Sequence, residues 1–261
     1  MDVTRKQFVK LAAGTVLAAA SGSISSLGEE QASPMGRPVK AIVFDAFVLF
    51  DARSIAKRLE AVFPGRGMEL ANLWRIRQFE YTWLRTLGQQ YVDFWHVTKD
   101  ALSYITSNMK LSLSFAQHES LMNAFRELPV WPDVPEALAE FHRRGIRMAF
   151  LSDLSAELLD TNLKAAKIRS FFEDHLTTDR VQAYKPSTKA YQMGPDVMGL
   201  RKDEIVFAAF GAWDAVGAKW FGYPTVWVNR GNVREEELGV HPDVITPDIS
   251  GLLKFIGGAS M

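Results

Sequence analysis

The chain has 261 residues, of which 48% are hydrophobic and 23% charged. This balance is typical of soluble globular domains and excludes a disordered, fibrous or polytopic membrane protein. Its 30 Lys and Arg residues match 30 Asp and Glu residues, so no net positive field attracts it to nucleic acid or anionic lipid, and we expect a small-molecule partner. The chain has no cysteine, which excludes disulfides, thiolate nucleophiles and Cys-ligated zinc, and its five histidines form no HExxH motif.

The first 38 residues have the composition of an export signal and linker. Arg5, Lys6 and Lys10 precede an apolar, small-residue run at 11–20, which is the order of an n-region and an h-region. The start is similar to a twin-arginine signal in which Lys6 replaces the second arginine. The run is shorter than the roughly 20 residues of a spanning helix, so we expect no stable membrane span. We predict export to a periplasm; the alternative is an N-terminal amphipathic helix on a cytoplasmic protein.

Apolar runs and helical patterns alternate after residue 38. The runs predicted as strands are 39–44, 147–151, 204–210 and 224–229, and the predicted helices are 134–144, 156–166, 189–198 and 215–221. Such alternation predicts an α/β fold with a mainly parallel sheet covered by helices on both faces. Ligands of these sheets bind beyond the carboxyl ends of the strands, where Asp45, Ser152 and Asp214 fall. We therefore expect these three residues to converge on one crevice.

Residues 53–128 contain no strand-like run and have several aromatic-rich helical patterns. We interpret them as a helical cap domain inserted into a core domain of residues 39–52 and 129–261. Because the insertion follows the first strand, it should cover the carboxyl edge of the sheet. Its hydrophobic surface is also compatible with a homodimer.

Three residues carry the candidate chemistry, and each has a structural alternative. Asp45 could act as a nucleophile, base or metal ligand, or only as a helix N-cap. Lys185 precedes Pro186, which favours an extended backbone; it is either a surface lysine or a buried cation that keeps Asp45 ionised. Asp214 could belong to the same site, could be the N-cap of the helix predicted at 215–221, or could have both roles, which are compatible.

The order of four short segments resembles the haloacid dehalogenase superfamily. The similar segments are 44–51, 151–153, 184–191 and 212–219, and the resemblance extends over about residues 39–255. The cap segments 63–67 and 73–85 are similar to the type II (S)-2-haloacid dehalogenases rather than to superfamily phosphatases. The resemblance implies a Rossmannoid core with an inserted cap, and hydrolysis of (S)-2-haloacids to (R)-2-hydroxyacids without a metal or other cofactor.

The resemblance also implies a role for each matching residue. Asp45 would displace the halide from C2 with inversion and form an ester that water hydrolyses. Lys185 would keep the carboxylate ionised, Asp214 would orient or activate the water, and Arg75 from the cap would receive the halide. The expected substrate-binding residues are Ser152, Asp153, Tyr191, Trp213 and Phe94.

Two positions depart from the family pattern. The first motif is one residue shorter than in family members, with Val48 in place of Gly-Thr, and we expect the altered turn to limit activity. Asp153 replaces an asparagine that commonly contacts the halide. An anion facing a departing anion would be unfavourable unless Asp153 is protonated or turned away.

Two other functions fit the same fold. A Mg²⁺-dependent phosphatase would need a second aspartate two residues after the nucleophile, where this chain has Phe47. A non-catalytic binding protein could also retain the fold after its first motif has changed.

Overall fold

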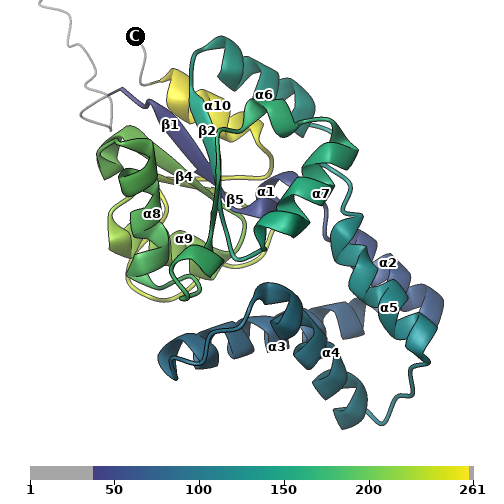
Figure 1. Ribbon diagram of the computed structural model, residues 1–261. Coiled ribbons are helices and arrows are strands. Elements are labelled where there is room, and N and C mark those ends of the chain that lie inside the picture. Colours follow the sequence, from purple (N-terminus) through teal and green to yellow (C-terminus); the bar gives the residue numbers. More distant parts are fainter. Residues whose placement is uncertain (1–37, 259–261) are drawn as a thin grey trace, which may run out of the picture. The chain divides into compact units, whose positions relative to one another are not determined.

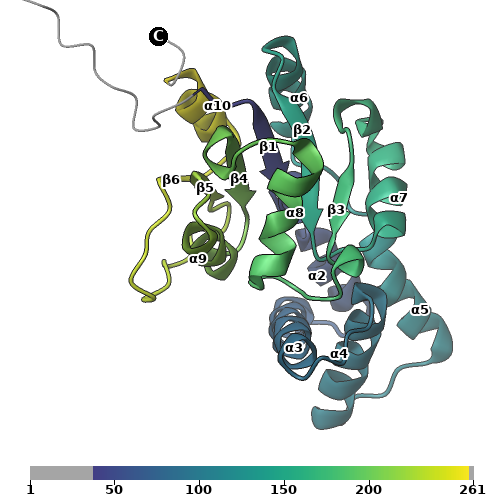
Figure 2. The ribbon, with the colours of Figure 1, turned by 60° about the vertical axis from the view of Figure 1, so that its left-hand side comes forward.

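Six parallel strands form the sheet at the centre of the molecule, in the order β3-β2-β1-β4-β5-β6 (Figures 1 and 2). The computed structural model describes residues 38–258, so the predicted export signal lies outside the described residues. The strands are β1 (Ala41–Phe44), β2 (Arg147–Ser152), β3 (His175–Thr177), β4 (Ile205–Ala209), β5 (Thr225–Val228) and β6 (Val244–Thr246). The predicted α/β fold with a parallel sheet is confirmed.

The two strands that the sequence did not predict are β3 and β6, each of three residues at an edge of the sheet. Strands this short carry too few residues for a recognisable periodicity. The central β1 belongs to a longer apolar run at 39–44, and all four residues of the strand are buried. A parallel strand covered on both faces appears in the sequence as a continuous apolar run, which is why β1 was predicted.

Alternate residues of β1 enter two separate hydrophobic clusters. Ile42 and Phe44 pack with α6 (Val134–Arg143), α7 (Ala156–Ala166) and α10 (Ser250–Gly257), whereas Ala41 and Val43 pack with α8 (Thr188–Met198) and α9 (Ala212–Phe221). Figures 1 and 2 show these helices on the two faces of the sheet. The period of two along β1 therefore produces the three-layer arrangement.

Every regular element described between residues 53 and 126 is helical. These elements are α2 (Arg53–Val62), α3 (Gly67–Leu87), α4 (Phe94–Asn108), α5 (Phe115–Asn123) and the 3-10 turn η1 (Ala124–Arg126). The segments that enter and leave this region are paired, because Phe50 forms an antiparallel bridge with Val130 and the Asp51 amide donates to the Pro129 carbonyl at 2.7 Å. The described residues 38–258 all belong to one compact unit, so the division between cap and core stays a prediction.

The remaining elements are short. They are the one-turn helix α1 (Ala46–Leu49) and the 3-10 turns η2 (Arg169–Phe171), η3 (Thr178–Arg180) and η4 (Lys202–Glu204). Within residues 38–258, no helix is both long enough and apolar enough to cross a bilayer.

Candidate active site

A single ammonium group joins two carboxylates at the carboxyl edge of the sheet. The Nζ atom of Lys185 donates to Asp45 Oδ2 and to Asp214 Oδ2, both at 2.7 Å. Asp45 directly follows β1 and Asp214 lies in the first turn of α9, which follows β4. Because β1 and β4 are neighbours in the sheet, residues 169 positions apart in the chain end within reach of one cation. Two of the three residues expected to converge, Asp45 and Asp214, thus contact the same ammonium group, which Lys185 supplies.

Asp45 combines the two roles that the sequence left open. Its Oδ1 caps α1 by accepting the Phe47 backbone N–H at 2.9 Å, while Oδ2 accepts from Lys185. Each oxygen therefore has a donor, which fixes the plane of the carboxylate. The Asp45 side chain is 12% exposed, compared with 0% for Lys185 and 1% for Asp214. Asp45 is consequently the member of this group that a small molecule reaches first.

Asp214 is not the N-cap of its helix, so that alternative is wrong. Helix α9 begins at Ala212, and Gly211 is its N-cap residue with extended backbone angles. The Asp214 side chain instead accepts from Lys185 and, through Oδ1, from the Tyr191 hydroxyl at 2.7 Å. Burial raises the pKa of Asp214 to about 6, although Lys185 and the Tyr191 hydrogen bond act to lower it.

Lys185 is fully buried, so the surface-lysine alternative is also wrong. Burial acts to lower the pKa of its ammonium group, but the charges of Asp214 and Asp45 raise it, and the net pKa lies above that of an ordinary lysine. Lys185 is therefore a permanent cation at neutral pH. It keeps Asp45 and Asp214 from repelling each other.

Ser152 and Asp153, at the end of the neighbouring β2, are both buried. Ser152 Oγ accepts the Leu154 backbone N–H at 3.1 Å, which leaves its hydroxyl proton for another acceptor. Asp153 Oδ1 accepts the Lys185 backbone N–H at 3.2 Å. Burial raises the pKa of Asp153 to about 7, and the charges of Asp214 and Asp45 add to this while Lys185 opposes it.

Trp213 connects this edge of the sheet to helix α3. Its ring packs against Phe79 and Trp83, with centroid distances of 4.9 and 5.6 Å. These two residues are one helical turn apart on the same face of α3. Arg75 lies one turn before Phe79, so it belongs to the face that meets Trp213. Arg75 is exposed, and its Nη2 lies 3.5 Å from Asn72 Oδ1.

Phe94, the other predicted residue of the cap, and Arg85, a second arginine on α3, lie in different surroundings. Phe94 is 2% exposed, and its ring packs against Phe125 and Tyr184 in the hydrophobic core. Its role in lining a substrate pocket stays a prediction. Arg85, on α3, is ion-paired with Asp100 at 2.9 Å.

Two residues that the sequence reasoning missed hold the short helix α1 that follows Asp45. Trp131 Nε1 donates to the Phe47 carbonyl at 3.3 Å, and Arg230 donates to the Val48 carbonyl at 3.1 and 3.2 Å. The guanidinium of Arg230 also lies over the Trp131 ring, 4.5 Å from its centroid. Arg230 comes two residues after the last residue of β5, so its place at the carboxyl edge of a strand was the signal that could have identified it.

The charged group contains no side-chain arrangement suited to a metal ion. Among residues 38–258, no group of three or more His, Asp or Glu side chains is placed to hold one. The space between Asp45 and Asp214 is occupied by the ammonium of Lys185.

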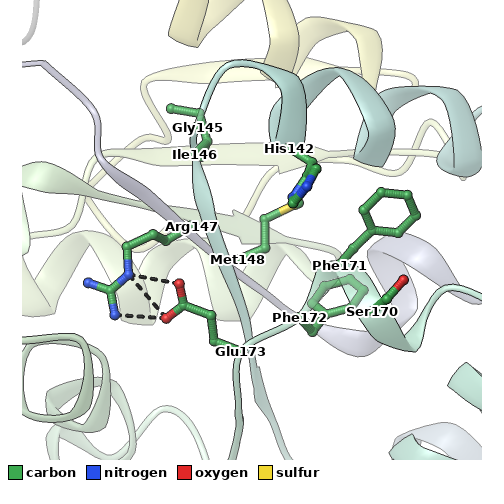
Figure 3. Close-up of a pocket in the computed structure, with 9 residues that line it drawn as sticks. All are labelled: His142, Gly145, Ile146, Arg147, Met148, Ser170, Phe171, Phe172 and Glu173. Carbon is green, nitrogen blue, oxygen red and sulfur yellow. Dashed lines mark hydrogen bonds and ion pairs between the residues drawn. The ribbon is translucent and has the colours of Figure 1, made fainter.

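A pocket of about 250 Å³ lies at the opposite end of β2 (Figure 3). Arg147, the first residue of β2, lines it together with Glu173, and the two form an ion pair at 2.7 Å. Ser152 is the last residue of the same strand, so this pocket is separated from the charged group by the length of the strand.

Comparisons with known proteins place the chain beside enzymes of one family. Residues 16–222 match the family described as haloacid dehalogenase-like hydrolase. The chain is 42% identical over 207 residues to an (S)-2-haloacid dehalogenase of Pseudomonas sp. (strain YL), covering 78% of this chain and 89% of the relative. The crystal structure of an L-2-haloacid dehalogenase matches with a TM-score of 0.82 and 35% identity over 85% of this chain and all of the other.

An enzyme from Xanthobacter autotrophicus is also similar. It is an L-2-haloacid dehalogenase whose structure contains covalently bound chloropropionic acid. The match has a TM-score of 0.78 and 29% identity, over 85% of this chain and 100% of that chain.

Proposed function

Because the chain belongs to the haloacid dehalogenase-like hydrolase family, we propose that it converts (S)-2-haloacids to (R)-2-hydroxyacids through an ester on Asp45. The observation that carries this proposal is the placement of Asp45. Its carboxylate is the exposed end of a charged group whose other two members are 0% and 1% exposed. The covalently bound chloropropionic acid in the Xanthobacter autotrophicus relative supports a covalent route.

The first half of the reaction is a displacement at C2. An Asp45 carboxylate oxygen attacks C2 in line with the carbon–halogen bond, and the bonding electron pair leaves with the halide. A new C2–O bond forms as the carbon–halogen bond breaks, which inverts the configuration. The chain contributes orientation, because Phe47 N–H and Lys185 Nζ hold the two oxygens at 2.9 and 2.7 Å, and positioning of this kind accounts for a large part of catalysis in displacement reactions.

The second half is hydrolysis of the ester. Water attacks the carbonyl carbon of the esterified Asp45, the carbonyl–O bond to the former substrate breaks, and the (R)-2-hydroxyacid leaves with a proton that derives from the water. Asp214 is the base that accepts this proton from the attacking water and then transfers it to the departing oxygen. Its pKa of about 6 suits this role, because a base close to the working pH is ionised and still accepts protons readily. The Tyr191 hydrogen bond at 2.7 Å orients the carboxylate.

The substrate and the leaving halide need donors of their own. The Ser152 hydroxyl and backbone N–H groups after β2 would bind the substrate carboxylate, and Trp213 would cover it from the side of α9. Arg75 would receive the halide from the α3 face that contacts Trp213 through Phe79. A guanidinium stays charged in a dry pocket, so it can stabilise an anion as it forms.

A phosphatase mechanism is disfavoured by the surroundings of Phe47. The Phe47 ring lies 6.0 Å from the Phe210 ring, at the position where a phosphatase would place its general acid. A phenyl ring cannot donate the proton that a leaving alcohol needs. The charged group therefore has a nucleophile, Asp45, and a base, Asp214. The position two residues after Asp45 provides no acid, because it is Phe47.

A single turnover in ¹⁸O-labelled water tests the proposal. With enzyme in excess over (S)-2-chloropropionate, the label should enter Asp45, and chiral analysis should identify (R)-lactate. Asp45→Asn should abolish halide release, whereas Asp51→Asn should retain it, because Asp51 pairs with Arg53 at the surface. Label that appears directly in lactate would refute the ester, and phosphate release without halide release would replace the proposed activity.

A further inference from the structure

Three carboxylates and one ammonium group meet in the site. Asp45, Asp153 and Asp214 are 8%, 6% and 1% exposed, and Lys185 is fully buried between two of them. With all three carboxylates ionised, the group would carry two net negative charges. The proposed substrate is itself an anion, and low solvent exposure strengthens repulsion between like charges. Arg75, which the proposed function places at the halide, would offset one of these charges, and a proton on one carboxylate would remove the other.

The contacts identify the residue that binds this proton. Asp45 has a donor on each oxygen, from Phe47 N–H and Lys185 Nζ, and Asp214 has donors from Lys185 and Tyr191. Asp153 does not receive the ammonium, and its Oδ1 accepts a backbone N–H at the longer distance of 3.2 Å. A hydrogen bond to the charged form favours ionisation, so the carboxylate with the weakest donors is protonated first.

We propose that Asp153 is protonated when the substrate binds, and that its neutral carboxyl group donates a hydrogen bond to the anionic substrate. This inference rests on the proposed function only for the identity of the anion. Because Asp153 Oδ1 accepts the backbone N–H of Lys185, the proton belongs on Asp153 Oδ2.

Asp45 and Asp214 act on Asp153 from the ends of β1 and β4, and Lys185 acts from the loop before α8. Burial also raises the pKa of Asp214 to about 6, so the charge of Asp214 is constant only above that pH. Tyr191 on α8 and Tyr184 beside Lys185 stay neutral, because burial, together with nearby charges that include Asp153, raises the pKa of each hydroxyl.

The direction of the pH dependence follows from these groups. Burial raises the pKa of Asp153 to about 7, so the proton is present below this pH and lost above it. Protonation of Asp214 should strengthen anion binding further below about pH 6, so the affinity that reports on Asp153 alone is the one measured around and above pH 7. Above it, the Kd should rise by about tenfold per pH unit until the pKa of the complex is reached.

Propionate, which has the substrate carboxylate but no halogen, is a suitable probe. We would measure its Kd by calorimetry from pH 5.5 to 9 for the wild type, for Asp153→Asn and for the matched control Asp196→Asn on the exposed side of α8. The wild type and the control should lose affinity above pH 7, and Asp153→Asn should not, because an amide donates at every pH. Carbon-13 NMR of the aspartate carboxyls in the wild type should show one group titrating near pH 7.

These measurements test the proton on Asp153 separately from the proposed dehalogenase reaction. A Kd that is independent of pH in the wild type, a slope that persists in Asp153→Asn, a failure of propionate to bind, or NMR titration of every carboxyl below pH 5 would overturn the role of Asp153. The halide-release assay is independent of these measurements. If (S)-2-chloropropionate releases no halide but the propionate affinity follows Asp153, the proposed reaction fails and the protonated carboxyl stands.

Discussion

Replacing Lys185 by methionine tests whether one buried cation holds the active site together. The substitution keeps the length of the side chain but removes the ammonium group that lies 2.7 Å from each of two carboxylates. Asp214 is the more affected of the two, because its side chain is 1% exposed and water cannot replace the lost charge. Removing one partner of a buried ion pair typically costs about 3 to 5 kcal/mol.

The cost should depend on pH in a definite direction. Without Lys185, the pKa of Asp214 in the folded state rises further above its unfolded value of 3.8. A carboxyl whose pKa is higher in the folded state lowers the free energy of unfolding least at a pH below its unfolded pKa. As the pH rises toward the folded pKa, the free energy of unfolding falls by up to about 1.4 kcal/mol per pH unit. In the wild type, the same loss ends near pH 6 for Asp214 and near pH 7 for Asp153. The variant should therefore continue to lose stability above pH 7, where the wild type has levelled off.

Thermal unfolding followed by circular dichroism at pH 5 and pH 8 measures this difference. At pH 8 the Tm of Lys185→Met should be about 6 to 20 °C below the wild type, and at pH 5 the gap should be much smaller. Lys219→Met is the matched control, because Lys219 forms a partly exposed pair with Asp243, and such pairs contribute about 0 to 1 kcal/mol. Equal Tm values for Lys185→Met and the wild type at pH 8 would refute the buried bridge.

Three further predictions concern the cap, the first motif and the N-terminus. Arg75→Lys should lower kcat for halide release by about 10- to 1,000-fold, whereas Arg85→Lys should not; equal turnover of Arg75→Lys would move the halide site elsewhere. Replacing Val48 by Gly-Thr should raise kcat/KM for (S)-2-chloropropionate. Because Val48 is fully buried, the replacement should also lower the free energy of unfolding by about 1 to 3 kcal/mol. An unchanged kcat/KM would show that the short turn does not limit catalysis. Mass spectrometry of the native protein should find a mature N-terminus between residues 20 and 39, and an intact Met1 would contradict export.

The predicted loss of stability on changing Val48 follows from the place of this residue in the fold. In the structure, Val48 lies inside the one-turn helix α1, and its side chain is part of the hydrophobic core. Its carbonyl accepts from Arg230. The cost of changing this residue therefore depends on Arg230 and on Trp131, which bonds the neighbouring Phe47 carbonyl, and no local sequence pattern reveals these contacts.

The sequence alone determined the central strands, the helices that cover them and the order of the site residues. Continuous apolar runs such as β1 result from burial on both faces, and this is a local property of the chain. The place of Asp45 at the end of such a run was equally visible. The edge strands β3 and β6 were not, because three residues are too few to show a period.

Only the tertiary structure decided which of the competing roles each polar residue has. Asp214 could have capped a helix and Lys185 could have faced solvent, and both alternatives satisfied every local rule. The parallel pairing of β1 with β4 brings Asp45 and Asp214 to the same edge, and the loop before α8 places Lys185 between them. The charge state of Asp153 depends on the same assembly. Electrostatic energies depend on distance and on exclusion of water, and both arise only when segments far apart in the chain come together.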